Sequence, residues 1–227
     1  MRDTRETSWT LIQGAVAGID ESRDELARRY RPVVMAYLRT RWRGSLLIDE
    51  AEDAAQEVLL DLLRPDGALS RLDPRRAGGF RSYFYGVIRN VALRFEERRR
   101  RRRESPRGSG SRFDLSAAEE TTVSEAFDRA WAASVLDQAA RIHVATARET
   151  GPDAARRVEL LRLKFAEGLP IREIAGLWGE EPERVHREYA KARREFKRAL
   201  FEVVGSLQPD RPEKVEEECA RLLDFFR

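Results

Sequence analysis

Apolar side chains recur every three or four residues along nearly the whole chain, and alternation with a period of two does not persist. The first spacing places apolar side chains on one face of an α-helix, whereas a half-buried strand requires alternation. We therefore predict an all-α protein. Its helices are expected roughly over residues 22–42, 50–64, 80–97, 124–149, 153–167, 171–178 and from 182 onward, with short ones before residue 22 and within 212–227.

The segment ESPRGSGS, residues 104–111, interrupts this pattern with proline, glycine and serine. Such a composition favours a flexible linker over a helix. A chain of 227 residues is long enough for two small helical modules, each with its own core. We predict a first domain at 1–104, a linker at 105–123, a second domain at 124–204 and a tail at 205–227, whose short helix caps the second core.

Composition excludes several kinds of site. The chain has one cysteine and two histidines, too few for a disulfide framework or a cysteine-based zinc site, so no metal or cofactor is expected. No carboxylate pair, glycine-rich phosphate loop or nucleophile–base spacing stands out, and we expect no enzymatic activity. The first residues lack the apolar core of a signal peptide, and no apolar run approaches the ~20 residues that span a bilayer. We expect a cytoplasmic protein without membrane insertion.

Charge is informative through its distribution. Lys and Arg number 43 against 40 Asp and Glu, so the net charge of +3 does not identify a partner. Residues 98–103, however, are six consecutive arginines, which build the local positive potential that phosphates seek. A run of this kind is also typical of a disordered tether. The sequence alone leaves both interpretations open.

Residues 153–200 predict a helix-turn-helix. Gly168 suits a left-handed C-terminal cap, Pro170 can open the next short helix, and Gly179 introduces a turn before the long helix that starts at Pro182. If Val185 faces the core, a basic outer face carries Glu183, Arg187, Ala190 and Arg194, flanked by Lys191, Lys197 and Arg198. Long side chains there could read base edges, with Arg187 donating to a guanine and Glu183 accepting from the amino group of a cytosine. A solvated helix face is the alternative, which the helix-turn-helix context disfavours.

Two further helices carry patterned polar residues. The helix after residue 80 interleaves aromatic and cationic side chains, as single-stranded nucleic acid binding requires: Arg81, Tyr83, Tyr85, Arg89, Asn90 and Arg94. From the residues alone, a core role for both tyrosines is the favoured interpretation. The helix at 50–64 has an acidic outer side, Asp49, Glu50, Glu52, Asp53, Gln56, Glu57 and Asp61, which by itself indicates a solvated surface.

Four stretches in order resemble the sigma-70 family, specifically the extracytoplasmic-function (ECF) group that keeps only regions two and four. They are LARRYRPVVMAYLR (26–39), DEAEDAAQEVLLDLL (49–63), FRSYFYGVIRNVALRFEERRRR (80–101) and LLRLKFAEGLPIREIAGLWGEEPERVHREYAKARREF (160–196). TSWTLIQGAVAG, RGSGSRFDLS and AFDRAWAASVLDQA are similar to members with a long linker. The resemblance implies a region-two helical bundle and a region-four helix-turn-helix joined by a flexible linker.

The resemblance also implies roles. The expected partners are core RNA polymerase, through the clamp helices of its largest subunit and its flap, promoter DNA, and an anti-sigma factor as a further partner that the family allows. Residues implied to bind polymerase are Asp53, Gln56, Glu57 and Asp61. Those implied to hold the minus-10 element are Arg81, Tyr83, Arg89, Asn90, Arg94 and Arg98. Those implied to read the minus-35 element are Glu183, Arg184, Arg187, Lys191 and Arg194.

Some residues depart from the family pattern and keep rival hypotheses open. Glu183 and Arg184 replace the small residues that are common at the start of this helix in the family, and Leu60 stands where the family often has an aromatic residue. Glu96 and Glu97 place acidic side chains among the basic residues of the helix after residue 80. The main rival is a stand-alone helix-turn-helix regulator that binds palindromic duplex DNA without polymerase. An RNA-processing enzyme and a decoy that has lost promoter recognition are the others.

Overall fold

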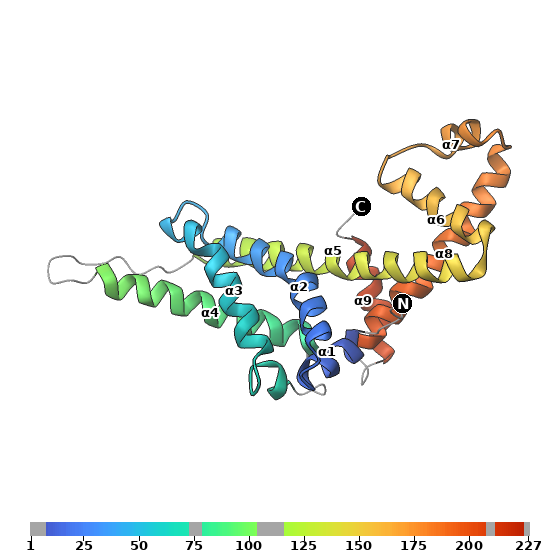
Figure 1. Cartoon of the computed structure of the whole chain (residues 1–227). Helices are drawn as coiled ribbons and strands as arrows, with labels where there is room; N and C mark the ends of the chain where they lie inside the picture. The colour runs from blue at the N-terminus through green and yellow to red at the C-terminus, as the bar shows by residue number, and fades with distance from the viewer. Residues whose placement is uncertain (1–7, 73–78, 104–115, 208–211, 225–227) are drawn as a thin grey trace.

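The computed structural model describes residues 8–72, 79–103, 116–207 and 212–224, and within these ranges all regular structure is helical, as predicted (Figure 1). The α-helices are α1 (Ser8–Val16), α2 (Asp20–Arg41), α3 (Ala51–Leu63), α4 (Gly79–Arg103), α5 (Ala117–Thr150), α6 (Pro152–Phe165), α7 (Ile171–Trp178), α8 (Pro182–Leu207) and α9 (Val215–Asp224). Short 3₁₀ helices cover Leu46–Glu50, Leu69–Arg71 and Pro212–Lys214.

Two helices extend beyond the expected bounds. α4 continues through the arginine run to Arg103, although we expected it to end where the run begins. Glu97 stabilises this last part by pairing with Arg100 at 2.7 Å and Arg101 at 2.8 Å, the spacings at which helix neighbours meet. α5 begins at Ala117, seven residues before the expected start, because Ser116 and Glu119 form a capping box.

The larger hydrophobic core joins helices from both predicted domains. It contains buried residues of α1 to α5, the second half of α8, and α9. Its aromatic centre brings Trp131 of α5 against Tyr30 of α2 at a ring-centroid distance of 5.4 Å, beside Phe80 and Phe84 of α4. The expectation that each module buries its own core is therefore wrong for the described residues. At ~1.5 Å per residue, α5 is about 50 Å long, enough to lie along α2 and still reach α6 and α8 (Figure 1).

The C-terminal helix α9 belongs to the same core. Cys219 and Leu222 are buried, and Leu222 lies beside Phe80 of α4, Trp131 of α5 and Leu207 of α8. We expected the tail to cap a separate core of the second domain. Instead, α9 packs where α4, α5 and α8 meet. Burial raises the pKa of the Cys219 thiol to about 11, so this side chain acts as a small apolar group.

A second, smaller core lies in the stretch that we predicted as a helix-turn-helix. It contains Leu160, Leu163, Ile171, Ile174, Ala175 and Val185, from α6, α7 and the start of α8. Gly179 adopts the left-handed conformation, with φ 65°, that lets the chain turn between α7 and α8. Phe165, expected inward, is 70% exposed, because Leu163 takes the inward position and two residues further the helix has turned ~200°.

Candidate polymerase and DNA interfaces

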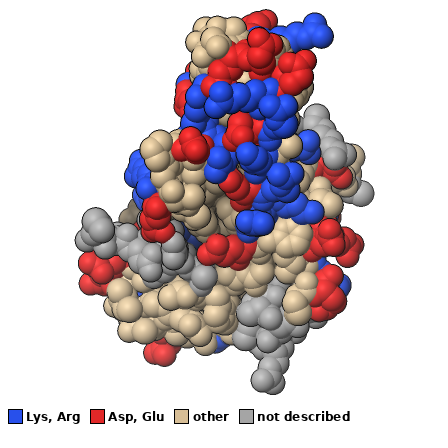
Figure 2. All heavy atoms as spheres, turned by 90° about the vertical axis from the view of Figure 1, so that its right-hand side faces the viewer, with Lys and Arg blue, Asp and Glu red and all other residues tan. Residues whose placement is uncertain are grey.

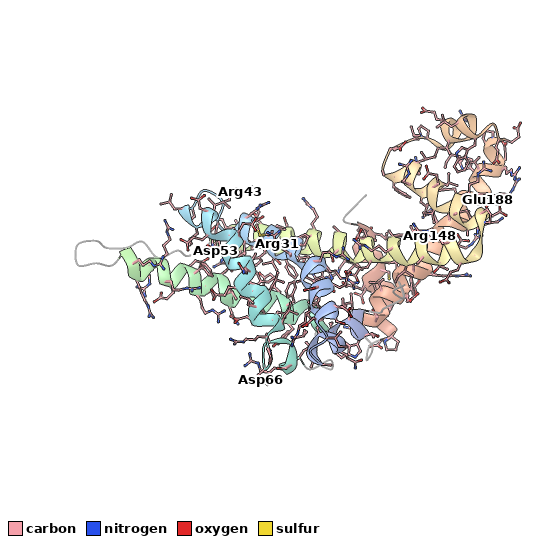
Figure 3. All side chains as sticks on the ribbon, viewed as in Figure 1. Arg31, Arg43, Asp53, Asp66, Arg148 and Glu188 are labelled. Atoms are coloured by element: carbon pink, nitrogen blue, oxygen red, sulfur yellow. The ribbon has the colours of Figure 1, made fainter. Side chains whose placement is uncertain are left out.

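The acidic side of α3 divides into an exposed part and a paired part. Asp53 and Gln56 are exposed, and no partner for either is found among the described residues. Glu52 beside them pairs with Arg31 and Arg39 of α2, the latter at 3.3 Å. Figure 3 places Asp53 and Arg31 on these neighbouring helices. Asp53 and Gln56 therefore form a surface that another molecule can contact without breaking a described ion pair.

Glu57 and Asp61, one and two helical turns further, are held by α4. Glu57 lies 2.8 Å from Arg98 and 3.4 Å from Arg94, and Arg94 also pairs with Asp61. Residues that we predicted to bind polymerase thus contact residues that we predicted to bind DNA. Both arginines are 49% exposed, so these pairs lie at the surface, where an ion pair contributes little and exchanges readily.

The first half of α4 is paired with α5 instead. Arg81 binds Asp128, and Arg89 lies 4.0 Å from Glu120. The two arginines are eight residues apart on α4, and their two partners are eight residues apart on α5. Asn90 is exposed. The arginines predicted to hold the minus-10 element thus all lie on α4, but each forms an ion pair with an acidic residue of α3 or α5.

The two tyrosines of α4 are partly buried. The Tyr83 hydroxyl donates a hydrogen bond to the carbonyl oxygen of Ala68. The Tyr85 ring packs edge-on against Phe127 of α5, with centroids 5.0 Å apart. Both make the core contacts that we favoured from the residues alone, and Tyr83 keeps part of its surface open.

A buried ion pair fixes α4 to α2. Glu96 accepts hydrogen bonds from Arg41 at 2.7 and 2.9 Å and from the Trp42 indole at 2.8 Å, and both members of the pair are nearly inaccessible to solvent. Sequence reasoning treated Glu96 as acid added to a basic surface. The structure corrects this view, because Glu96 faces inward and Glu97 pairs along its own helix. Neither residue therefore supports a decoy.

The outer face of α8 is exposed as predicted, and Figure 2 shows Lys and Arg gathered on the end of the molecule that α8 forms with its neighbours. Glu183, Arg184, Arg187, Lys191 and Arg194 are all exposed. Arg184 lies 3.7 Å from Glu180 and Lys191 lies 2.7 Å from Glu188. Within the described ranges, no ion-pair partner is found for Arg187 or Arg194. These two guanidinium groups are therefore available to a ligand.

Contacts that sequence reasoning missed hold α8 in place. Arg157 of α6 pairs with Glu195 at 2.8 Å and Glu188 at 3.4 Å, and His143 of α5 lies 3.5 Å from Glu195. Burial alone would raise the pKa of Glu195, but Arg157 holds it below its ordinary value. Burial lowers the pKa of His143, and Glu195 opposes this effect only in part. His143 therefore stays neutral at neutral pH. No local pattern around His143 indicated this contact.

Neither a metal cluster nor a membrane span is found in the part of the chain that the structure describes. No group of three or more His, Cys, Asp or Glu side chains there could hold a metal ion. No described helix is both long and apolar enough to cross a bilayer.

Comparison with known proteins agrees with this geometry over one part of the chain. Residues 26–104 match the family model of sigma-70 region 2, a range that contains most of α2 and the whole of α3 and α4, with the acidic surface and the arginines of α4. A comparison with curated proteins found no match. Over residues 26–104 this chain is therefore similar to sigma-70 region 2.

Proposed function

We propose that this protein is an ECF-type sigma factor that binds core RNA polymerase, recognises the minus-35 and minus-10 elements of a promoter and promotes DNA opening. The observation that carries the proposal is the exposed Asp53 and Gln56 surface beside the cationic helix α4, inside the range that matches sigma-70 region 2. Such a factor works where the polymerase and the chromosome are, in the cytoplasm.

The proposed division of labour follows the predicted domains. Residues 1–104 would dock on the clamp helices of the polymerase and hold the minus-10 element, and residues 124–204 would read the minus-35 element. Asp53 and Gln56 suit the first contact because they are exposed and without a described partner. Glu57 and Asp61 would join them after leaving their arginines.

The α8 surface suits a major groove. The helix begins at Pro182 and presents Arg187 one turn later, where a long donor can reach base edges, and Arg194 two turns further, where it can reach phosphates. Glu183 and Arg184 stand at the first turn beside it. The smaller core behind α8 holds this helix against α6 and α7, so that the groove meets a preformed surface.

The α4 surface suits a single strand. Arg81, Arg89, Arg94 and Arg98 supply positive charge along one helix, and Tyr83 and Asn90 supply a ring and an amide. Base stacking and backbone neutralisation are the two contributions that single-strand binding needs. Holding the displaced strand favours the open promoter by differential binding, with no covalent bond broken.

Binding to sigma-free bacterial core polymerase tests the proposal. The double variant Asp53→Ala/Gln56→Ala should lose most of the binding that the unmodified protein shows in a gel-filtration or pull-down assay. A matched control is Gln13→Ala/Asp24→Ala, which changes the same residue types at exposed positions of α1 and α2. Absence of binding by the unmodified protein, together with tight binding of a palindromic duplex, would favour the stand-alone regulator.

A further inference from the structure

A ladder of charges joins α3 to α4. In spatial order it runs Arg98, Glu57, Arg94, Asp61, with Glu57 shared by both arginines and Arg94 shared by both carboxylates. The two acids are four residues apart on α3 and the two arginines are four residues apart on α4, so both helices advance ~6 Å between the contacts. The match of spacing allows both helices to present the pairs on facing sides.

Neighbouring contacts keep the ladder in register. The Arg98 guanidinium lies 4.2 Å from the centroid of the Phe95 ring, and Arg99 pairs with Glu50 at 2.7 Å. Beneath them Glu96 is tied to Arg41 in the core. The α4 backbone is therefore fixed against α2 and α3, while the ladder side chains remain partly exposed. Its charges can change partners without a change in fold.

We propose that this ladder is a latch that couples polymerase docking to single-strand binding. The inference rests on the proposed function, in which Glu57 and Asp61 bind polymerase and Arg94 and Arg98 bind DNA. In the free protein the two carboxylates and the two arginines neutralise each other. When polymerase cations take the two carboxylates, the arginines lose their counter-charges and become available to phosphates.

The coupling is reciprocal, as linkage requires. DNA that takes Arg94 and Arg98 releases Glu57 and Asp61 and thereby strengthens polymerase binding. Exposed ion pairs are individually weak, so the ladder should change either affinity by about three- to tenfold. That size suits a latch, since stronger pairs would resist exchange.

Single-strand binding by the free protein tests whether the two carboxylates keep the two arginines from binding DNA. We would measure fluorescence anisotropy of a labelled single-stranded oligonucleotide of mixed sequence, without polymerase and at low salt. Glu57→Gln/Asp61→Asn should raise affinity about three- to tenfold. The matched control Asp24→Asn/Asp49→Asn removes two carboxylates at exposed positions of α2 and of the 3₁₀ helix before α3, with no described partner. It should raise affinity less than about twofold, by long-range charge alone. Equal gains would overturn the latch.

Polymerase binding gives the second measurement. Arg94→Gln/Arg98→Gln should strengthen binding of core polymerase in the absence of DNA, because it releases the two carboxylates. It should also abolish the gain in polymerase affinity that the oligonucleotide produces with the unmodified protein. Unchanged or weaker polymerase binding would overturn the latch and leave the proposed function standing. Failure of the unmodified protein to bind polymerase would overturn both.

Discussion

α4 and α8 are similar helices placed in different surroundings. They have 25 and 26 residues, and both carry arginines along an exposed side. On α4, Arg81, Arg89, Arg94 and Arg98 are each paired with an acid of α3 or α5. On α8, Arg187 and Arg194 have no ion-pair partner within the described residues. Composition thus says how much positive charge a helix carries, and packing says how much of it is available.

The difference follows from position. α4 pairs with both α3 and α5, whose facing sides carry Glu57, Asp61, Glu120 and Asp128. The first half of α8 extends beyond the larger core and packs against α6 and α7 in the smaller core (Figure 1). We therefore expect α8 to bind duplex DNA as it stands and α4 to bind only after its partners are exchanged.

The largest expected effect concerns the anchoring of α4. Arg41→Met should lower the free energy of unfolding by about 3–5 kcal/mol, because it leaves Glu96 buried without its counter-charge. Arg98→Met, which removes an exposed partner of Glu57, should cost less than about 1 kcal/mol. Urea denaturation measures both. Equal losses would mean that buried and exposed pairs of α4 contribute alike, and the distinction between anchor and exchangeable surface would fail.

The second effect concerns the availability of α8. Arg187→Ala should weaken binding of the free protein to a duplex selected for affinity by about 1–3 kcal/mol and relax the preference at one base position. Arg89→Ala on α4 should change this affinity little, since Arg89 is engaged by Glu120. Arg221→Ala, exposed on α9, serves as the control. An equal loss with Arg89→Ala would erase the contrast between the two helices.

Salt dependence gives a smaller and more general distinction. Arg194→Ala should reduce the slope of log affinity against log salt for duplex binding by about one, as expected for one lost phosphate contact. Arg94→Ala should leave the slope unchanged in the free protein, because Glu57 and Asp61 already neutralise Arg94. The measurement is a titration of the labelled duplex at several salt concentrations. A lower slope with Arg94→Ala would show that the α4 arginines are free.

The smallest expected effect is a response to acid at the base of α8. Burial lowers the pKa of His143, so the unfolded chain binds this proton more readily than the folded protein does. Stability should therefore fall as pH drops through the unfolded pKa of about 6.5. His143→Gln should flatten the dependence of the melting temperature on pH between about 7.5 and 5.5. The control is His186→Gln, which changes the same residue type at an exposed position of α8. If the melting temperature of His143→Gln depended on pH as that of the unmodified protein does, protonation of His143 would not contribute to stability in this range.

Much of the local structure could be predicted from the sequence. The bounds of α7 at 171–178, the start of α8 at Pro182 and its exposed basic face agree with the structure. Each depends on helical periodicity and on Gly168, Pro170 and Gly179, whose backbone preferences act within a few residues. The assignment of these surfaces to polymerase and DNA stays a prediction.

The sequence by itself determined the helical class, the bounds of α7, the start of α8 and the charges that each helix carries, because these follow from local spacing along the chain. Only the tertiary structure decided which charges remain available. The Arg41–Glu96 pair joins residues 55 apart, and Arg29 donates to Gln138 across 109 residues. Glu96 is buried and Glu97 beside it is not, although both look alike in sequence. Their burial differs because the packing of the helices determines which side chain is removed from water, and no local sequence pattern indicates this.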